Sequence, residues 1–564
     1  MGVAMSGSRR CLNMRNPFGK ALILAIGLFV VCTMVTRSDR LDVRTTIVRA
    51  GTLAKEPTSS QQSLSQYDAW QEKVGVIPEQ NGSKGTGDIG SPGHAFPNTS
   101  HPMTCDYNMG HLRKWQKKYG LEGTFEYSKR YVRVSRQDIP RRSMTKLQQS
   151  FLPEKLRTVN VSRTYKSEPC PEPLIVPVSK SPFPSTANLS EFMFGISTIY
   201  NRFNDPNTSP VSDWTYWLTN GKGDSNGGKL LLMLADASVE ELGDAADQLA
   251  EAGIDADVYR SDGRLPMAVR YLALVPTMYK HRERRRKKWL VTADDDTFFL
   301  SPHRLGQTMR QYDAQQPMYI GTFSEDVNNI DRHGPQAFGG AGVFLSVPTA
   351  QQITEDFDLC KSDQKVREAN SGWGAQGDIL LRRCITDNSE TQLTLLNDLW
   401  QLDMYGDPSG FYESGRIALS LHHYRGGGWH IAHPRHYTKV ARICGEDCTL
   451  QRFQTADDFI LSNGFSVAYY PEGIDFDTNQ VERTFSPAPE DKGWNFDFTF
   501  GPQRPSLHKT GRKISWDLQE AIVERDGSIS QIYVRKHDDW RWKYPDGSPM
   551  SNTDGIIEVV WLRA

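Results

Sequence analysis

Net charge is what this sequence lacks most clearly. Its 564 residues include 66 Lys and Arg against 67 Asp and Glu, which leaves a formal charge of −1. So close a balance removes the uniform positive field of proteins that coat nucleic acids, and we expect no nucleic-acid partner. The 46 glycines and 31 prolines are near average frequency, so the chain is neither fibrous nor disordered throughout.

Long hydrophobic runs are also scarce, and a mean hydropathy of −0.55 excludes a polytopic membrane protein. The exception is residues 21–36, an uncharged run slightly shorter than the roughly 17–25 residues of most membrane helices. The four charged residues before it are all basic, which favours a cytoplasmic N-terminus: Arg9, Arg10, Arg15 and Lys20. The sequence therefore predicts a cytoplasmic tail over 1–19 and an uncleaved type II anchor over 20–36. A cleaved signal peptide is the alternative, although no small-x-small site follows Val35.

Cysteine is sparse, with eight residues in all. Cys11 and Cys32 fall in the tail and span, and the rest form an even set: Cys105, Cys170, Cys360, Cys384, Cys444 and Cys448. This fits up to three disulfides in an oxidising compartment, and nearness in sequence suggests Cys360–Cys384 and Cys444–Cys448. Zinc at Cys444-x3-Cys448 is less favoured because no second Cys/His pair lies nearby. Five glycosylation sequons also indicate secretion: Asn81, Asn98, Asn160, Asn188 and Asn207.

The rest of the chain divides by composition into four segments. Residues 37–104 are rich in Ser, Thr, Gln, Gly and Pro and predict a disordered stem, because such a segment buries too little surface to fold. Residues 105–185 are mixed and are interpreted as a membrane-proximal extension of the main domain. In residues 186–435 apolar strand runs alternate with helical patterns, which predicts an α/β domain with a mostly parallel sheet. Residues 436–564 carry short alternating aromatic segments between turns and predict a small β-rich C-terminal domain.

Besides a helix over residues 349–359, two helices are expected within the α/β segment. A Ser cap followed three residues later by Glu opens an amphipathic pattern over residues 238–253. A second, longer pattern over residues 266–288 is expected to form one helix. In sheets of this kind ligands bind at the carboxyl ends of the strands.

Three consecutive acids, Asp294, Asp295 and Asp296, directly follow the apolar segment 289–293. Burying like charges at a strand end is costly unless a cation or hydrogen bonds compensate. Carboxylates suit Mg²⁺ or Mn²⁺, and these cations in turn bind phosphate oxygens. Strand alternation sends Asp294 and Asp296 to one side and Asp295 to the other. A solvated acidic turn is the alternative, but the apolar residues on both sides disfavour it.

Three further motifs follow along the chain: FGGAGVFLSVP (338–348), SGWGAQGDILLRRCI (371–385) and ALSLHHYRGGGWH (418–430). Each is ordinary by itself. A Gly-Gly pair is usually a turn, and Asp378 near a helix start is often only favourable to the helix dipole. A single strand His is usually structural, whereas a His pair before three glycines could supply a metal ligand.

In this order, the motifs ADDDTFF, FGGAGVFLSVP, GDILLRRCI and SLHHY resemble the fringe-like β-1,3-glycosyltransferases of glycosyltransferase family 31, and most closely the family's fungal branch. The resemblance covers about residues 190–435 and does not explain the C-terminal β region. It implies a GT-A-type nucleotide-sugar-binding fold, a UDP-sugar as donor substrate, and Mn²⁺ or Mg²⁺ as cofactor.

The resemblance also assigns metal and donor residues. It implies that Asp294, Asp295 and Asp296 hold the metal and the donor sugar. His422 would complete a metal set with Asp294 and Asp296, and His423 is the alternative one residue along. At the end of the first strand, the resemblance places two residues near the nucleotide: Thr198 and Arg202.

Asp378 matches the position where the family places its catalytic base. The family often has two acids there, whereas Gly377 precedes Asp378 in this chain. Should Asp378 not be the base, Glu325 or Asp326 is the next candidate. The base would deprotonate the acceptor hydroxyl while the metal neutralises the leaving diphosphate. One base on the far side of the ring from the leaving group gives inversion.

The predicted function is therefore inverting, metal-dependent transfer of a hexose or N-acetylhexosamine from a UDP-sugar to a glycan or glycoprotein, with a β-1,3 linkage. The predicted location is the Golgi membrane, single-pass type II with a luminal catalytic domain. A catalytically inactive carbohydrate-binding protein on the same fold is the alternative, and a metal-dependent hydrolase is third. Trp373 and Trp429 flank the expected site. Either could stack on a sugar, but core packing is the favoured interpretation for both.

Overall fold

The computed structural model describes residues 47–49, 104–105, 107–152, 156–486 and 499–563. The predicted tail and anchor, nearly all of the predicted stem, and the sequons at Asn81 and Asn98 lie outside these ranges. Within the described ranges no helix has both the length and the apolar character needed to cross a membrane.

The α/β part of the chain is built on a mixed, mainly parallel sheet. Seven of its eight strands follow one another in this order: β10 (Ala256–Ser261), β9 (Lys229–Ala235), β8 (Phe192–Thr198), β11 (Trp289–Ala293), β14 (Val343–Ser346), β13 (Tyr319–Gly321) and β15 (Leu393–Leu395). Only β14 runs antiparallel to its two neighbours among these strands. The predicted α/β class is therefore confirmed.

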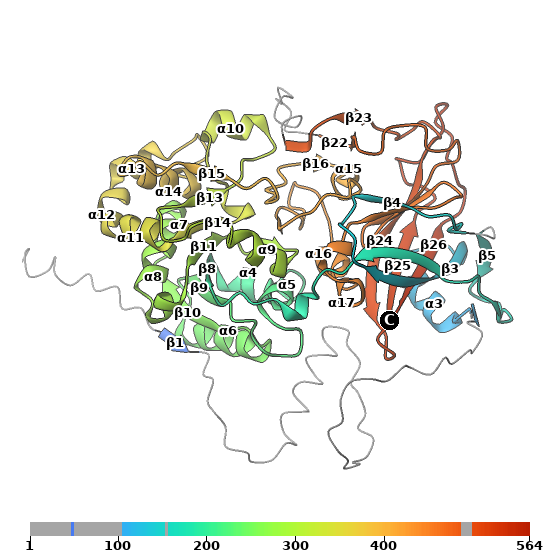
Figure 1. Ribbon diagram of the computed structural model, residues 1–564, viewed down its shortest axis with the longest axis horizontal. Helices are drawn as coiled ribbons and strands as arrows, with labels where there is room; N and C mark the ends of the chain where they lie inside the picture. The colour runs from blue at the N-terminus through green and yellow to red at the C-terminus, as the bar shows by residue number, and fades with distance from the viewer. Residues whose placement is uncertain (1–46, 50–103, 106, 153–155, 487–498, 564) are drawn as a thin grey trace, which may run out of the picture. The chain divides into compact units, whose positions relative to one another are not determined.

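Helices cover both faces of this sheet (Figure 1). Alternate side chains of a strand point to opposite faces, and the apolar side chains on each face are buried under helices. Phe192, Phe194 and Ile196 of β8 belong to one core with α5 (Val211–Leu218) and α6 (Val239–Glu251). Met193 belongs to the core on the other face. The helices of that face are α7 (Met267–Leu272), α8 (Leu274–Lys280), α11 (Val347–Glu355) and α14 (Gly377–Thr386).

One of the two helix predictions is confirmed and the other is wrong. The α6 helix begins with the expected capping box, in which Ser238 Oγ accepts from the Glu241 N–H and Glu241 Oε2 accepts from the Ser238 N–H. The single helix expected over 266–288 is instead split into α7, α8 and a 3-10 turn over Arg282–Arg286. Pro276 explains the first break, because it has no N–H to donate and its ring clashes with the carbonyl four residues earlier.

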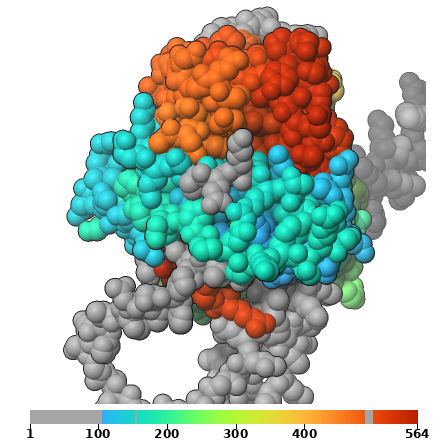
Figure 2. All heavy atoms as spheres, turned by 90° about the vertical axis from the view of Figure 1, so that its right-hand side faces the viewer, coloured from blue at the N-terminus to red at the C-terminus, as the bar shows by residue number. Residues whose placement is uncertain are grey.

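A second sheet of ten strands joins the two ends of the described chain. It contains β4 (Met144–Lys146), β18 (Arg452–Gln454), β19 (Phe459–Ser462), β20 (Ser466–Tyr469), β24 (Ile514–Val523), β25 (Ile529–Arg535), β26 (Gly555–Leu562), β3 (Thr124–Gln137), β5 (Arg157–Asn160) and β7 (Leu174–Ser179). The link is β26, which pairs in parallel with β3. Figure 2 shows N-terminal atoms (blue to teal) beside C-terminal atoms (orange to red). Residues 105–185 and 436–564 differ in composition and lie far apart in sequence, yet strands from both share this sheet.

Two short strands lie between the two cores. β12 (Phe298–Phe299) pairs antiparallel with β17 (Ser420–Leu421). Phe298 and Leu421 belong to the core of the second sheet, whereas Phe299 and the neighbouring Leu419 belong to the α/β core. Both cores therefore fix the position of this strand pair.

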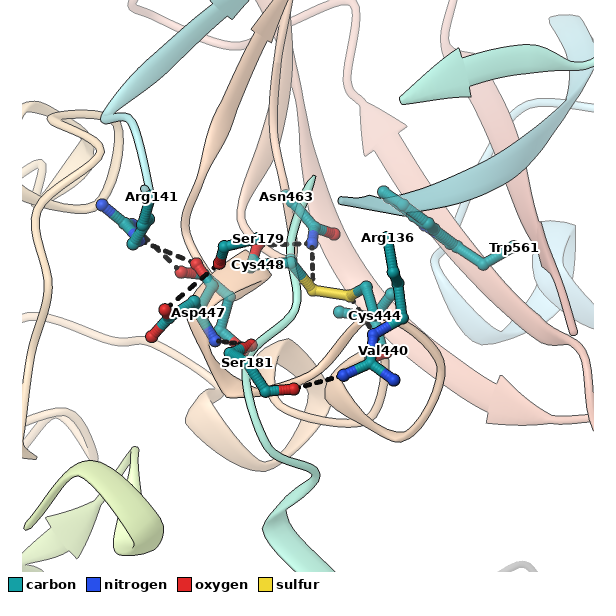
Figure 3. The surroundings of a disulfide bond; sticks show 12 residues. Arg136, Arg141, Ser179, Ser181, Val440, Cys444, Asp447, Cys448, Asn463 and Trp561 are labelled. Atoms are coloured by element: carbon teal, nitrogen blue, oxygen red, sulfur yellow. Dashed lines mark hydrogen bonds between the residues drawn. A yellow bond between two sulfur atoms is a disulfide. The ribbon is translucent and has the colours of Figure 1, made fainter. Parts of the chain in front are cut away.

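The disulfide Cys444–Cys448 closes a short acidic loop (Figure 3). This loop contacts the α/β part at α9. Glu446 in this loop is buried, and its carboxylate accepts the N–H groups of His303 (2.9 Å) and Arg304 (3.1 Å) in the first turn of α9 (Pro302–Met309). The carboxylate of Asp447 pairs with Arg304 at 2.6 Å. The loop thus binds the second sheet to α9.

The described cysteines form three disulfides, Cys105–Cys170, Cys360–Cys384 and Cys444–Cys448. The two pairings suggested by nearness in sequence are confirmed, and the zinc alternative at Cys444-x3-Cys448 is wrong because both sulfurs are bonded to each other.

Candidate functional site

The site begins where β8 and β11 end at the same edge of the sheet. The two strands are parallel, with Ala293 opposite Ile196, so the residues that follow them meet. Thr198 Oγ1 donates to Asp295 Oδ2, and Arg202 Nη2, on α4 (Tyr200–Phe203), lies 2.5 Å from Asp295 Oδ1. Asp295 is buried, and burial raises its pKa. Thr198 and Arg202 therefore orient and neutralise this buried carboxylate.

The β12–β17 pair brings His422 to the other two acids. His422 Nε2 lies 3.1 Å from Asp296 Oδ1 and 3.5 Å from Asp294 Oδ2. One ligand atom from each residue lies within 4.8 Å of the others, a separation at which a single ion can contact all three. Two carboxylates and an imidazole make a donor set that suits Mn²⁺ and is acceptable to Mg²⁺.

The charges within this group are strongly coupled. Burial lowers the pKa of His422, but the carboxylates of Asp296 and Asp294 outweigh burial and raise that pKa well above its ordinary value. Burial likewise raises the pKa of Asp296, and the facing His422 outweighs it and lowers that pKa. A proton on His422 and a cation between the carboxylates therefore compete for the same negative charge. Metal binding requires a deprotonated imidazole, so a bound cation would displace this proton.

The donor set itself fits a divalent cation. His422 Nε2 is the ring atom that faces Asp294 and Asp296, so two carboxylates and one imidazole nitrogen point toward the same space. These three groups supply two negative charges and one neutral nitrogen when His422 is deprotonated, which suits a divalent ion.

The turn Gly339–Ala341 explains the Gly-Gly motif. Thr297 Oγ1 donates to the Gly340 carbonyl at 2.8 Å, and Ser420 Oγ donates to the Ala341 carbonyl at 2.6 Å. A Cβ on Gly340 would collide with the imidazole of His422. The metal group thus packs directly against a backbone surface that tolerates no side chain.

Asp378 lies in the first turn of α14, partly buried beside the same turn. Its carboxylate lies against Gly339, where an added Cβ would come within 2.7 Å of Asp378 Oδ1. Burial, together with the carboxylate of Asp294, raises the pKa of Asp378 to about 7. A carboxyl group that titrates near neutrality is suited to take a proton in a catalytic step. A Cβ on Gly377 would collide with the ring of Tyr271, so close packing explains why no second acid precedes Asp378.

His423 has a different environment from His422. Its Nδ1 lies 2.8 Å from Asp403 Oδ1, and its ring lies between the ring of His422 (centroids 3.8 Å apart) and that of Trp429 (4.1 Å). It therefore supports the orientation of His422 and is not grouped with the acids. Sequence reasoning missed Asp403. The available signal was a single acid within the apolar segment 399–404.

The two reserve candidates for the base have other roles. Asp326 caps α10 (Val327–His333) by accepting the Asn328 N–H at 2.8 Å. Glu325 is 1% exposed, and its Oε2 accepts the Asp403 N–H at 3.1 Å. Burial, followed by the charge of Asp403, raises the pKa of Glu325 to about 8.

We expect Glu325→Gln to flatten the pH dependence of stability. Because the folded pKa of about 8 exceeds the unfolded value, the folded state holds the proton more tightly, and stability falls as pH rises toward 8. The variant has no proton to lose there. Between about pH 5 and pH 8 it should avoid a loss of about 2–4 kcal/mol, measured by chemical denaturation. Glu355→Gln, an exposed position on α11, is the control. Equal slopes for wild type and Glu325→Gln would contradict the assignment.

The two flanking tryptophans differ. Both faces of Trp429 are covered, one by His423 and the other by Tyr405 (centroids 4.6 Å apart), so packing is the correct interpretation there. The prediction of core packing is wrong for Trp373, whose side chain is 75% exposed.

A second acidic group among the described residues is already neutralised. Asp257, His281 and Glu283 lie close enough to share an ion. However, the Lys229 ammonium lies 3.4 Å from Asp257 and 3.6 Å from Glu283 and supplies the positive charge itself. This group is therefore a buried ion network.

Comparison with known proteins gives one family match. Residues 261–425 match the family model described as Fringe-like. The matched stretch contains the three acids, Asp378 and His422, but neither Thr198 nor Arg202. Among curated proteins none matches the sequence.

Several solved structures are similar to parts of the chain. Mouse xyloside xylosyltransferase 1 shares 13% identity over 36% of this chain and 84% of its own, with a TM-score of 0.23. The galactosyltransferase LgtC, solved with donor and acceptor sugar analogues, shares 11% identity over 39% of this chain and 77% of its own (TM-score 0.27). Core-mannan synthase A from Aspergillus fumigatus, in an Mn/GDP form, shares 9% identity over 39% and 77% (TM-score 0.24). Values this low establish neither substrate nor mechanism for this chain.

Proposed function

We propose that this glycosyltransferase, whose residues 261–425 match the Fringe-like model, transfers a hexose or N-acetylhexosamine from a UDP-sugar to a glycan or glycoprotein acceptor. The reaction inverts the anomeric carbon and forms a β-1,3 linkage on a GT-A-type domain. The observation that supports this most strongly is the convergence of Asp294, Asp296 and His422 within 4.8 Å beside a turn that also contacts Asp378.

Each residue of the site has a distinct task in this proposal. Asp294, Asp296 and His422 would hold Mn²⁺ or Mg²⁺, which when bound supplies charge neutralisation for the leaving diphosphate. Arg202, whose side chain is 61% exposed, orients Asp295 and presents its remaining N–H groups to the donor.

Asp378 takes the proton from the acceptor hydroxyl as that oxygen attacks the anomeric carbon. Close packing against Gly339 keeps the carboxylate in place for this step. With a single base opposite the leaving group, attack occurs from the far face of the sugar, which gives inversion.

We also propose a Golgi location, with the catalytic domain in the lumen and a single N-terminal span in the membrane. Three disulfides among the described residues support an oxidising compartment. The basic tail and apolar run of the N-terminus supply the orientation.

The test is UDP release by the purified full chain across a panel of UDP-sugars, each with Mn²⁺ or with EDTA. We expect turnover with one or a few donors, its loss in EDTA, and recovery when Mn²⁺ is restored. Activity that survives EDTA would refute the metal assignment. Sugar binding without turnover of any donor would favour the inactive carbohydrate-binding alternative.

A further inference from the structure

The loop before α14 holds one aromatic side chain in a fixed, exposed position. Asn370 Oδ1 accepts the N–H groups of Gly372 (2.9 Å) and Gly374 (3.1 Å), and Asn370 also forms a β-bridge with Ala375. Both glycines have φ near +95° (96° and 94°), a conformation that other residues rarely adopt. Trp373, between them, is therefore held by the backbone and not by packing of its own ring.

Trp373 is the most exposed large hydrophobic side chain among the described residues, at 75%. Leaving an indole in water forgoes burial free energy that the other large aromatic side chains of the chain mostly obtain. The guanidinium of Arg332, at the end of α10, lies 5.3 Å from the centre of this ring. The guanidinium lies over one face of the indole, so the opposite face is the apolar surface left open to a ligand.

The position of this pair points to its ligand. Trp373 precedes Asp378 by five residues, so the chain separates the two Cα atoms by at most about 18 Å. Arg382, one turn after Asp378 on α14, donates to the His333 carbonyl next to Arg332. Trp373 and Arg332 are thus tied to the helix that carries the proposed base.

The open face of Trp373 matches a sugar ring. One face of a pyranose carries C–H groups that pack on an aromatic ring, and Arg332 covers only the opposite side of this indole. Trp429 cannot act in this way because both of its faces are covered. Because Trp373 is 75% exposed whereas Asp378 is partly buried, a ring on Trp373 would be a different sugar unit from the one whose hydroxyl reaches Asp378.

We infer that the acceptor is an oligosaccharide of at least two sugar units, one stacked on the face of Trp373 opposite Arg332 and another presenting its hydroxyl to Asp378. This inference rests on the proposed function. It names the acceptor class and makes Trp373 the residue that selects extended glycans over monosaccharides.

The first test compares acceptors of different length in the full chain. Trp373→Ala should raise KM for di- and trisaccharide acceptors by about 5- to 100-fold, the range that stacking on an aromatic side chain supports. KM for the UDP-sugar and the rate with simple monosaccharide glycosides should be unchanged, and Trp373→Phe should restore much of the loss. Trp540→Ala, a change at another exposed tryptophan (53% exposed), is the matched control. An equal effect on mono- and oligosaccharide acceptors would overturn the inference.

The second test does not need turnover. An array of oligosaccharides and the matching monosaccharides is probed with wild type, Trp373→Ala and Trp540→Ala, after thermal melting has shown that all three are folded. Wild type and Trp540→Ala should bind oligosaccharides, and Trp373→Ala should not. Equal binding by Trp373→Ala would overturn the inference. If no UDP is released but oligosaccharide binding still depends on Trp373, the transferase reaction is refuted and the assignment of Trp373 stands.

Discussion

Replacing Asp378 with Asn should lower kcat by about 10²–10⁴-fold, the usual contribution of a positioned general base. The amide keeps the shape of the side chain and fits in the same place against Gly339, but it cannot take a proton from the acceptor. Binding of UDP and Mn²⁺ should therefore be nearly unchanged. The measurement is steady-state UDP release together with calorimetric titration of UDP in the presence of Mn²⁺.

Asp387→Asn is the matched control, because Asp387 ends the same helix α14 and pairs with Lys365 at 2.5 Å, outside the site. It should leave kcat unchanged. Turnover retained by Asp378→Asn would remove Asp378 from the mechanism. Loss of UDP binding in that variant would show instead that the residue serves the donor.

The carboxyl group of Asp378 also predicts how kcat/KM depends on pH. Burial and Asp294 raise the pKa of Asp378 to about 7, and only the deprotonated form acts as a base, so kcat/KM should rise with pH. A dication bound to Asp294 lowers that pKa, which places the inflection between the ordinary value of about 4 and the value of about 7.

Gly340→Ala should lower Mn²⁺ affinity and metal-dependent turnover by about 10- to 100-fold, the range typical of changes next to metal ligands. The added methyl group would occupy the space of the His422 imidazole, which has buried neighbours on its other sides, so the ring must leave its position facing Asp296. The variant changes no ligand, which distinguishes it from direct removal of His422.

Mn²⁺ titration and UDP release measure this effect, with thermal melting to establish that the fold is kept. Gly243→Ala on α6 is the control, because a Cβ there meets nothing within 4 Å and the backbone is helical. If Gly340→Ala binds Mn²⁺ as tightly as wild type does, His422 is not a ligand.

The elements around the site could be predicted because their signals are local. The capping box of α6 and the apolar runs of β8, β9 and β11 depend on neighbours in sequence. The acids could be placed at a strand end for the same reason. That His422, and not His423, faces them depends on the β12–β17 register, which pairs residues more than a hundred positions apart.

The strand pairing of the second sheet also could not be predicted from local sequence patterns. Nothing near residue 130 indicates that β3 pairs with β26, more than 400 residues later. Trp373 was misjudged for a related reason. Composition favours burial of an indole, but the Asn370 contacts that hold it outward are made by backbone N–H groups, which side-chain patterns do not reveal.

The strand pair between the two cores limits how far this chain can be shortened. A fragment ending at residue 435 would retain every proposed catalytic residue, yet it would expose Phe298 and Leu421 to water and remove the carboxylate that caps α9. His422 directly follows Leu421 of β17. If truncation loosened that strand, the imidazole would therefore move away from Asp294 and Asp296, even though no site residue had been removed. The ten-stranded sheet is thus part of the minimal enzyme, and expression boundaries should enclose both segments that build it.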